Sequence, residues 1–275
     1  MEDYEKVGYL NTTHKIFYIL ESKMKEIDLH YHDFNKILIL LNGHVDYYIE
    51  GKTYPLLPND IILVSAGKVH RPILSDNSPY ERIIIYVSDK FSKSNEVDLF
   101  QCFKAQNSEI IRPKVMPSCV SSLVQNLKNE LISPKFGSDY YKQAILTELL
   151  VYINRIILNK NELSNITSTS NQTILNILEY INNHLAEDLS INTIANAFFL
   201  NRSYLMHLFK LETGYTINSY ITNKRLFAAQ KLLSDTDNSI TSICYQCGFK
   251  SYSSFYRAYT LKYNVAPKRA KNINS

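Results

Sequence analysis

The sequence predicts a multidomain chain of the α+β class, with a small β-barrel or sandwich followed by helices. A length of 275 residues and a hydrophobic content of 45% favour two domains over one. Short apolar runs fill residues 14–90, and an apolar period of helical spacing replaces them after residue 116. The strands and the helices therefore occupy separate stretches of the chain.

The first stretch contains runs that are apolar or alternate between apolar and polar residues. They are KIFYIL, NKILILL, HVDYYIE, KTYPLL, DIILVSA and ERIIIYV, separated by turn sequences such as NG, EG and PND. Short strands at this spacing are typical of a barrel or a sandwich.

Two amphipathic helices are predicted next, over residues 117–132 and 138–158. One apolar face contains Val120, Leu123, Val124, Leu127 and Leu131, and the other contains Tyr141, Ile145, Leu149, Tyr152 and Ile156. These faces either pack against a second copy of the hairpin, which would make a dimer, or pack back on the barrel.

The polar stretch NKNELSNITSTSNQ, residues 159–172, lacks an apolar period and is the linker candidate. Beyond it the pattern is helical throughout. After a helix over residues 172–185, a short helix starting at Ser190 and a longer one from Asn201 to Gly214 are expected. A long helix follows, and the same short and longer pair then repeats from Ser239 and Ser251.

This repeated unit matches a helix-turn-helix, whose second helix enters the DNA major groove. The core faces would hold Leu205, Leu208 and Phe209 in the first unit, and Phe255 and Tyr259 in the second. A connecting helix of roughly 16 to 18 residues is about 25 Å long. It could set the two recognition helices about 34 Å apart, which is one DNA turn.

The charge distribution agrees with a polyanionic partner. Residues 172–275 contain 11 Lys and Arg against 6 Asp and Glu, a charge of +5, whereas the whole chain carries +4. The C-terminal third is therefore the basic part of the protein.

Other features exclude some classes of protein. No stretch approaches 18 uncharged apolar residues, and the N-terminus MEDYEKVGYLNTTHK is acidic and polar, unlike a signal peptide, so we expect a cytoplasmic protein without membrane contact. The CYQC sequence at Cys244 and Cys247 lies in a predicted helix without a second cysteine pair. We interpret these cysteines as packing residues, with zinc or redox use as the alternative.

Two segments, IANAFFLNRSYLMHLFKLETGYTINSYITNKRLFAAQKLL and ITSICYQCGFKSYSSFYRAYTLKYNVAPKRAK, closely resemble the paired helix-turn-helix domain of the AraC/XylS family of bacterial transcription regulators. The departures are Cys244 where Ala is usual, Tyr259 where Phe is usual, Asn264 where Gly is usual, and Ala270-Lys271 in place of an aromatic-Arg pair. None falls on the outward faces, so they affect local packing more than DNA binding.

The resemblance implies a set of DNA-binding residues. The base-reading residues would be Arg202, Ser203, Met206, His207, Tyr252, Ser253, Ser254 and Arg257, and the phosphate-binding residues would be Lys210, Lys250 and Lys262. The Arg257 guanidinium can bond the O6 and N7 atoms of a guanine together, which is worth roughly 1 to 3 kcal/mol of discrimination. The alternative for each charged residue is a solvated helix face.

The barrel carries a second resemblance. His30, His32, Lys36 and Gly43 follow the spacing HxHxxxKx6G, and Ser65, Gly67 and His70 follow SxGxxH. Both are similar to the two cupin motifs of the barrel that many sugar-responsive AraC regulators use as a sensor. Lys36 replaces the motif's Glu, and an ammonium repels a cation, so no metal or cofactor is expected.

The cluster of His30, His32, Lys36 and His70 instead suits a small ligand, through hydrogen bonds to sugar hydroxyls, a carboxylate or a phosphate. The alternative is a set of rim histidines with structural roles only.

Together these patterns predict a cupin-like sensor barrel (residues 1–115), a helical dimerisation hairpin (116–160), a linker (161–171) and an AraC-type double helix-turn-helix (172–271). The resemblance implies a homodimeric regulator, an activator rather than a repressor, that binds promoter DNA, contacts RNA polymerase and responds to a sugar or sugar derivative in carbohydrate metabolism. We do not expect an enzyme. Two alternatives remain: a metal-dependent cupin enzyme with an accessory helical domain, and a DNA-binding regulator without a ligand.

Overall fold

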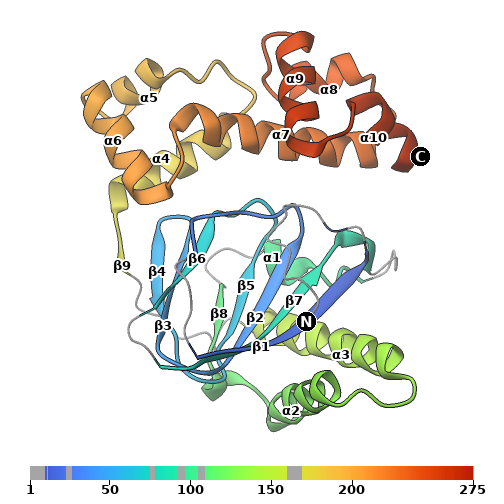
Figure 1. The fold of residues 1–275 in the computed structure, drawn as a ribbon. Coiled ribbons are helices and arrows are strands. Elements are labelled where there is room, and N and C mark those ends of the chain that lie inside the picture. The colour runs from blue at the N-terminus through green and yellow to red at the C-terminus, as the bar shows by residue number, and fades with distance from the viewer. Residues whose placement is uncertain are drawn as a thin grey trace. The chain divides into compact units, whose positions relative to one another are not determined.

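The computed structural model describes residues 10, 12–22, 27–74, 78–91, 97–104, 109–159 and 169–274 (Figure 1). The chain divides into two compact units, Met1–Thr169 and Ser170–Ser275. Most of the predicted linker, residues 160–168, lies outside the described residues. The fold class is confirmed, since the first unit is rich in strands and the second is helical.

The first unit contains two antiparallel sheets. Its strands are β1 (His14–Glu21), β2 (Asn35–Asn42), β3 (Val45–Ile49), β4 (Lys52–Pro55), β5 (Ile61–Val64), β6 (His70–Leu74), β7 (Tyr80–Val87) and β8 (Ile110–Ile111), with a short β9 (Thr169–Ser170) at the unit boundary. One sheet has the order β1-β7-β2-β5-β8, and in the other β3 pairs with β4 and β6. Each of the six runs predicted as strands forms one.

Strand β6 was not predicted from the sequence. Its segment contains Pro72, which lacks a backbone N–H and argues against a strand in a sequence pattern. In the structure β6 lies at the edge of its sheet, where a proline is tolerated, and Pro72 pairs with Tyr47 of β3. The edge position explains how this segment joins the sheet.

Alternate residues of the first sheet face two different cores. On β2, Leu38 and Leu40 belong to the cluster inside the barrel, whereas Ile37 and Ile39 belong to a cluster on the opposite face. The pleat turns successive side chains to opposite sides of a sheet, and both sides are covered here. The run NKILILL is therefore almost continuously apolar.

Helices α2 (Ser118–Ile132) and α3 (Ser138–Leu158) cover the outer face of this sheet, and α1 (Gln101–Lys104) joins the same cluster through Cys102 and Phe103. Figure 1 shows α2 and α3 side by side along the barrel. Val120, Leu127 and Ile145 pack with residues of β2, β5 and β7. Of the two arrangements predicted for the apolar faces of the hairpin, the structure shows packing on the barrel.

One residue placed on that face does not take part. Tyr141 is 45% exposed, and the buried residues of α3 begin one turn later, at Ile145. The first turn of α3 lies beyond the cluster, so the prediction for Tyr141 was wrong.

The second unit contains α4 (Gln172–Asn183), α5 (Ile191–Ala197), α6 (Arg202–Thr213), α7 (Ile217–Asp235), α8 (Ile240–Gln246), α9 (Tyr252–Tyr263) and α10 (Pro267–Asn274). The predicted N-caps are present: the side chains of Ser190, Asn201, Ser239 and Ser251 each accept a hydrogen bond from a backbone N–H two or three residues later. A capping side chain satisfies one of the donors that a helix start leaves open. The repeated short and longer helix pair is confirmed.

The departures from the family pattern fit into this unit. Asn264 ends α9 with a φ of 54°, a left-handed conformation that Asn tolerates in place of Gly. Tyr259 is buried next to Phe255, at 5.5 Å between ring centroids. Cys244 and Cys247 are buried thiols, and burial raises the pKa of both, that of Cys247 to about 11. Such cysteines behave as packing residues.

None of the helices in the described part of the chain is both long enough and apolar enough to span a membrane.

Candidate nucleic-acid interface and sensor cluster

The two recognition helices bury one face and expose the other. In α6, Leu205 and Phe209 are fully buried, and in α9 Phe255 is fully buried. The exposed residues are Arg202, Ser203, Met206, His207 and Lys210 on α6, and Tyr252, Ser253, Tyr256 and Arg257 on α9. The buried faces hold each helix in its unit, and the exposed faces carry most of the predicted base-reading residues.

Several predicted contact residues already form hydrogen bonds within the chain, among them Ser254 and Lys262. Ser254 is half-buried, and its hydroxyl donates a hydrogen bond to the Ser251 carbonyl at 2.8 Å. Lys262 is also half-buried, and its ammonium donates to the Asn223 carbonyl at 3.4 Å. The Lys262 ammonium keeps two further N–H donors, and the Ser254 hydroxyl can still accept a hydrogen bond.

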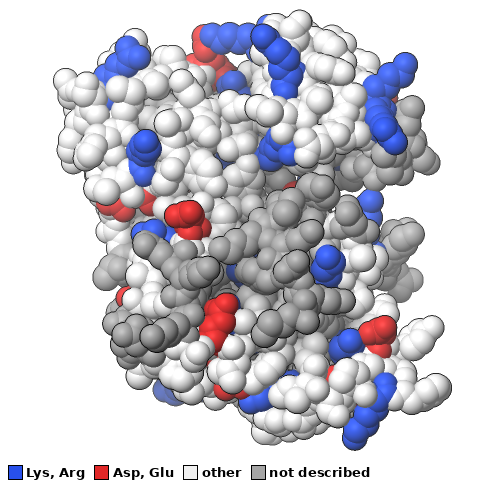
Figure 2. All heavy atoms as spheres, viewed as in Figure 1, with Lys and Arg blue, Asp and Glu red and all other residues white. Residues whose placement is uncertain are grey.

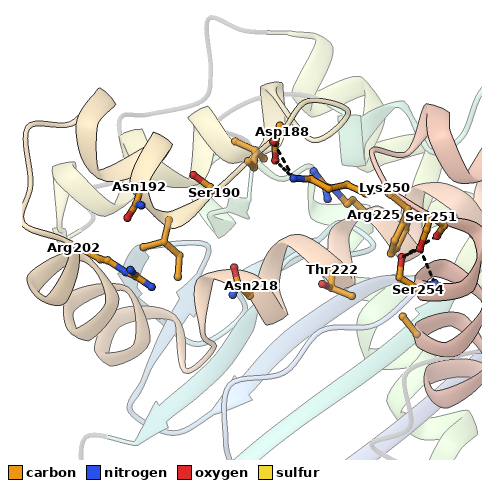
Figure 3. Close-up of a pocket in the computed structure, with 14 residues that line it drawn as sticks. Asp188, Ser190, Asn192, Arg202, Asn218, Thr222, Arg225, Lys250, Ser251 and Ser254 are labelled. Carbon is orange, nitrogen blue, oxygen red and sulfur yellow. Dashed lines mark hydrogen bonds and ion pairs between the residues drawn. The ribbon is translucent and has the colours of Figure 1, made fainter.

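A groove of about 710 Å³ lies between the two helix-turn-helix units (Figure 3). Its lining includes Arg202 from α6, Asn218 and Thr222 from α7, and Ser254 from α9. Asn218 and Thr222 are four residues apart and therefore share a helix face. Sequence reasoning treated α7 as a spacer and missed this polar pair, although its spacing was visible in the sequence.

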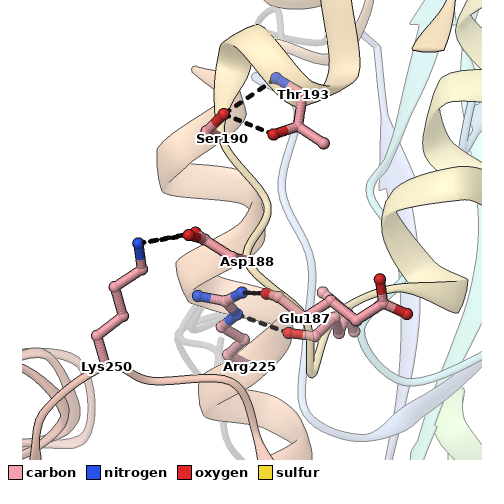
Figure 4. Close-up of polar contacts among 7 residues, drawn as sticks. Glu187, Asp188, Ser190, Thr193, Arg225 and Lys250 are labelled. Atoms are coloured by element: carbon pink, nitrogen blue, oxygen red, sulfur yellow. Dashed lines mark hydrogen bonds and ion pairs between the residues drawn. The ribbon is translucent and has the colours of Figure 1, made fainter. Parts of the chain in front are cut away.

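Arg225, in the middle of α7, fastens the loop between α4 and α5. Its Nε donates to the Leu185 carbonyl at 2.8 Å, and Nη2 donates to the Glu187 carbonyl at 2.7 Å (Figure 4). Gly248, with a φ of 86°, also touches this loop, because a Cβ there would collide with the Leu185 carbonyl oxygen. The Arg225 side chain thus joins the backbone of this loop to α7, and Gly248 brings the same loop against the second helix-turn-helix unit.

An ion pair adds to this junction. The Lys250 ammonium lies 2.8 Å from the Asp188 carboxylate, and both side chains are largely exposed (Figures 3 and 4). Lys250 was predicted to bind a DNA phosphate. The structure places it at the groove with an internal carboxylate partner.

The charged side chains of the C-terminal unit are spread over its surface. Figure 2 shows Lys and Arg side chains separated by uncharged residues over these helices, with acidic atoms next to basic ones near one edge. Several separate cations suit a set of discrete phosphate contacts along a DNA backbone.

The first unit brings the four predicted ligand-binding residues together. His30 and His70 form an isolated β-bridge, with the His70 N–H donating to the His30 carbonyl at 2.8 Å. One ring nitrogen each of His30, His32 and His70 lies within 4.8 Å of the others. The Lys36 ammonium donates to His70 Nε2 at 3.5 Å. The sequence motifs thus converge on one cluster.

Burial controls the protonation of this cluster. It lowers the pKa of His32 to about 2, with further lowering by Lys36 and His30. It also lowers the pKa of His70 well below its usual value, and the Lys36 charge adds to this effect. The pKa of Lys36 itself is lowered to about 7, first by burial and then by Arg82. His32 and His70 are therefore neutral at neutral pH.

The three imidazoles could hold a metal ion, but Lys36 opposes it. Its Nζ already donates to the Nε2 lone pair of His70, which a metal would need, and its positive form repels a cation. The donor set fits a ligand that accepts hydrogen bonds from Lys36 better than it fits a cation.

Comparisons with known proteins agree with this organisation. The family model described as a helix-turn-helix domain matches residues 194–272, and the one described as an AraC-like ligand binding domain matches residues 17–150. The HTH-type transcriptional activator RhaS of Shigella sonnei is 23% identical over 260 residues, covering 90% of both chains. RhaS of Mannheimia succiniciproducens is 23% identical over 245 residues, covering 88% of both chains.

Solved structures are also similar to this chain. ToxT from Vibrio cholerae O395 is 15% identical over 96% of this chain and 98% of its own, with a TM-score of 0.40. The DNA-binding domain of AdpA, in complex with a target DNA, is 21% identical over 36% of this chain and 88% of its own, with a TM-score of 0.35.

Both family models match in the chain order that the strands and helices indicate, and the RhaS relatives extend over both of them. These relatives are regulators of transcription and not enzymes, which confirms that expectation. The chain belongs to the AraC family of transcription regulators, with an AraC-like ligand-binding domain ahead of a helix-turn-helix DNA-binding domain.

Proposed function

We propose that this regulator activates transcription by placing α6 and α9 in the major groove of a promoter when its barrel binds a sugar or a sugar derivative. The observation that carries the proposal is the exposure of two polar recognition faces, each backed by its own buried apolar residues, within one helical unit. The RhaS relatives are named as transcriptional activators, which supports activation over repression.

The exposed residues divide by chemistry into two groups. The Arg257 and Arg202 guanidiniums can each bond two acceptors on a guanine, and the Met206 and Tyr252 side chains can contact thymine methyl groups. Lys210 and Lys250 bind phosphates, which gives affinity and salt dependence without base discrimination.

Ligand binding to the barrel controls DNA binding by stabilising one arrangement of the protein over another. A ligand at His30, His32, Lys36 and His70 shifts the balance between arrangements only if it binds one of them more tightly. Several of the cluster's groups are buried, so ligand binding and the packing of the barrel are coupled.

The proposed homodimer cannot use the buried stripes of α2 and α3, which pack on the barrel. The opposite side of the hairpin and its turn expose Ile132, Phe136 and Tyr140, and these are the apolar residues we assign to a second subunit. Sedimentation equilibrium would test this assignment. A dimer that Phe136→Ser converts to a monomer is expected, and an unchanged dimer would move the interface elsewhere.

Selection from a random double-stranded DNA library with the purified full-length protein tests DNA recognition. We expect an enriched site with two elements about one helical turn apart, roughly 10 to 10.5 base pairs between centres. Failure to enrich any sequence would remove the proposal. A reporter placed behind the selected site then separates activation, which also requires contact with RNA polymerase, from repression.

A further inference from the structure

Within the described part of the barrel, one buried lysine has no acidic partner. Lys36 is 2% exposed, and the ion pairs found in the described part of the chain do not include it. Arg82, the other buried cation inside the barrel, pairs with Glu21 at 2.8 Å. A buried charge is costly unless it is paired. Lys36 therefore needs either a neutral form or an anion that the described residues do not supply.

Its position on β2 places Lys36 inside the barrel. It pairs with Val64 of β5 and Tyr86 of β7, and Leu38, two residues along the same strand face, belongs to the interior cluster. The ammonium lies 5.8 Å from the centre of the Tyr47 ring. An aromatic face and an imidazole partly stabilise a cation, but neither neutralises it.

His32 is a second buried group with unmet hydrogen bonds. It is 2% exposed, and neither ring nitrogen has a hydrogen-bond partner among the described residues. The ring is held by stacking on Phe34, with centroids 4.5 Å apart and planes 13° apart. An unsatisfied buried polar group destabilises the folded state, so a bound molecule that bonds to this ring would recover that free energy.

The neighbouring histidines have defined tautomers. His70 Nδ1 lies 2.9 Å from the Lys68 carbonyl, and His30 Nδ1 lies 2.7 Å from the Asp28 carbonyl. A carbonyl oxygen only accepts, so both Nδ1 atoms carry the hydrogen. In the neutral rings, Nε2 is then an acceptor. The cluster thus combines one cationic donor with imidazole acceptors that suit hydroxyl groups.

We propose that the cluster binds a polyhydroxylated carboxylic acid, a sugar acid, with its carboxylate on Lys36 and its hydroxyls on His32 and the neighbouring imidazoles. This deepens the proposed function and rests on the barrel being the sensor. A neutral sugar would supply no counter-charge to the protonated form of Lys36. A phosphate ester carries about −1.5 to −2 at neutral pH, more than one lysine offsets.

Binding to the full-length protein would be measured by isothermal titration calorimetry and thermal unfolding at constant ionic strength. The probes are D-gluconate, D-glucuronate and D-galacturonate, with D-glucose, D-galactose and glucose 6-phosphate as matched compounds. We expect at least one acid to bind and to raise the melting temperature, and its neutral counterpart to do neither.

Two variants assign the effect to the cluster. Lys36→Met should lower the affinity for the acid by about 30-fold or more, because the carboxylate loses the charged partner of a buried pair. His32→Phe should lower this affinity less, since the variant loses only a neutral hydrogen bond to the ligand. Lys15→Met removes an exposed lysine on β1 and is the matched control, with unchanged affinity expected. Circular dichroism and promoter binding establish that each variant is folded.

Several outcomes would overturn the inference: no binding of any of the three acids, tighter binding of glucose 6-phosphate, or equal affinity of the wild-type and Lys36→Met proteins. Uptake of one equivalent of Zn²⁺ would assign the cluster to a metal instead. Each of these can occur while promoter selection succeeds, in which case DNA recognition stands and only the ligand class falls.

Discussion

The Lys250 ammonium and the Asp188 carboxylate lie 2.8 Å apart and connect the loop after α4 to the turn before α9. The two side chains are 75% and 70% exposed, so solvent and salt screen the pair and its contribution to stability is at most about 1 kcal/mol. A DNA phosphate that approaches Lys250 must compete with this carboxylate. We therefore expect Asp188 to limit DNA affinity at the groove.

Asp188→Asn should strengthen promoter binding up to about fivefold, since it frees Lys250 at the cost of a weak surface pair. The gain should shrink as salt is added, because exposed charges are screened. Fluorescence anisotropy at several salt concentrations measures both effects. Glu179→Gln, an exposed change on α4, removes the same charge away from Lys250. An equal gain in both variants would mean that only net charge matters.

Arg257→Ala and Lys210→Ala should weaken DNA binding in different ways. Loss of the guanidinium should cost about 1 to 3 kcal/mol and relax the base preference at one position. Loss of the lysine should weaken all sequences alike and reduce the salt slope by about 1. Binding to a library of single-base variants of the selected site distinguishes them. An unchanged base preference in Arg257→Ala would remove this residue from the reading set.

Gly248→Ala should destabilise the helical unit more than Gly137→Ala destabilises the barrel unit. Both glycines have a positive φ, 86° and 75°, so each alanine carries a strain of about 1 to 2 kcal/mol. Only at position 248 does the added Cβ meet a backbone carbonyl, that of Leu185, whereas nothing lies within 4 Å at position 137. Denaturant unfolding monitored for each unit measures the difference. Equal losses of stability in the two variants would show that the loop carrying Leu185 moves away from the added Cβ without a cost in free energy.

The barrel should lose stability in acid through its buried histidines. Folding keeps His32 neutral down to about pH 2, whereas the unfolded chain protonates it below about pH 6.5. The unfolded state thus binds more protons in this window, so stability falls as the pH drops below 6.5.

His32→Phe should reduce the stability lost between pH 7 and pH 5 by about 2 kcal/mol. Its ring keeps the stacking partner Phe34, which limits the effect on packing. Denaturant unfolding at the two pH values measures the change. His44→Phe makes the same substitution at an exposed histidine and controls for the introduction of a phenylalanine. If His32→Phe lost as much stability between pH 7 and pH 5 as the wild type, the acid sensitivity would not come from His32.

Much of the local structure was predictable because its causes are local. Capping residues such as Ser190 and Ser251 start helices through bonds to their own chain neighbours, and the apolar period of α3 identifies it as a helix. Strand β6 was not predicted because it contains Pro72, and whether a proline fits a strand depends on which strand lies beside it. The same limit applies to the hairpin of α2 and α3, because its apolar pattern does not indicate which surface covers these faces.

The sequence alone determined the two types of domain, the repeated helix-turn-helix, the outward positions of Arg202 and Arg257, and the residues that meet as a histidine and lysine cluster. Only the tertiary structure decided that Lys36 is buried without an acidic partner in the described barrel, that Arg225 holds the Leu185 loop, and that Lys250 pairs with Asp188. The physical reason is distance along the chain. Helix and strand patterns arise from residues a few positions apart, whereas these contacts join residues about 40 to 60 positions apart and exist only once packing brings their backbones together.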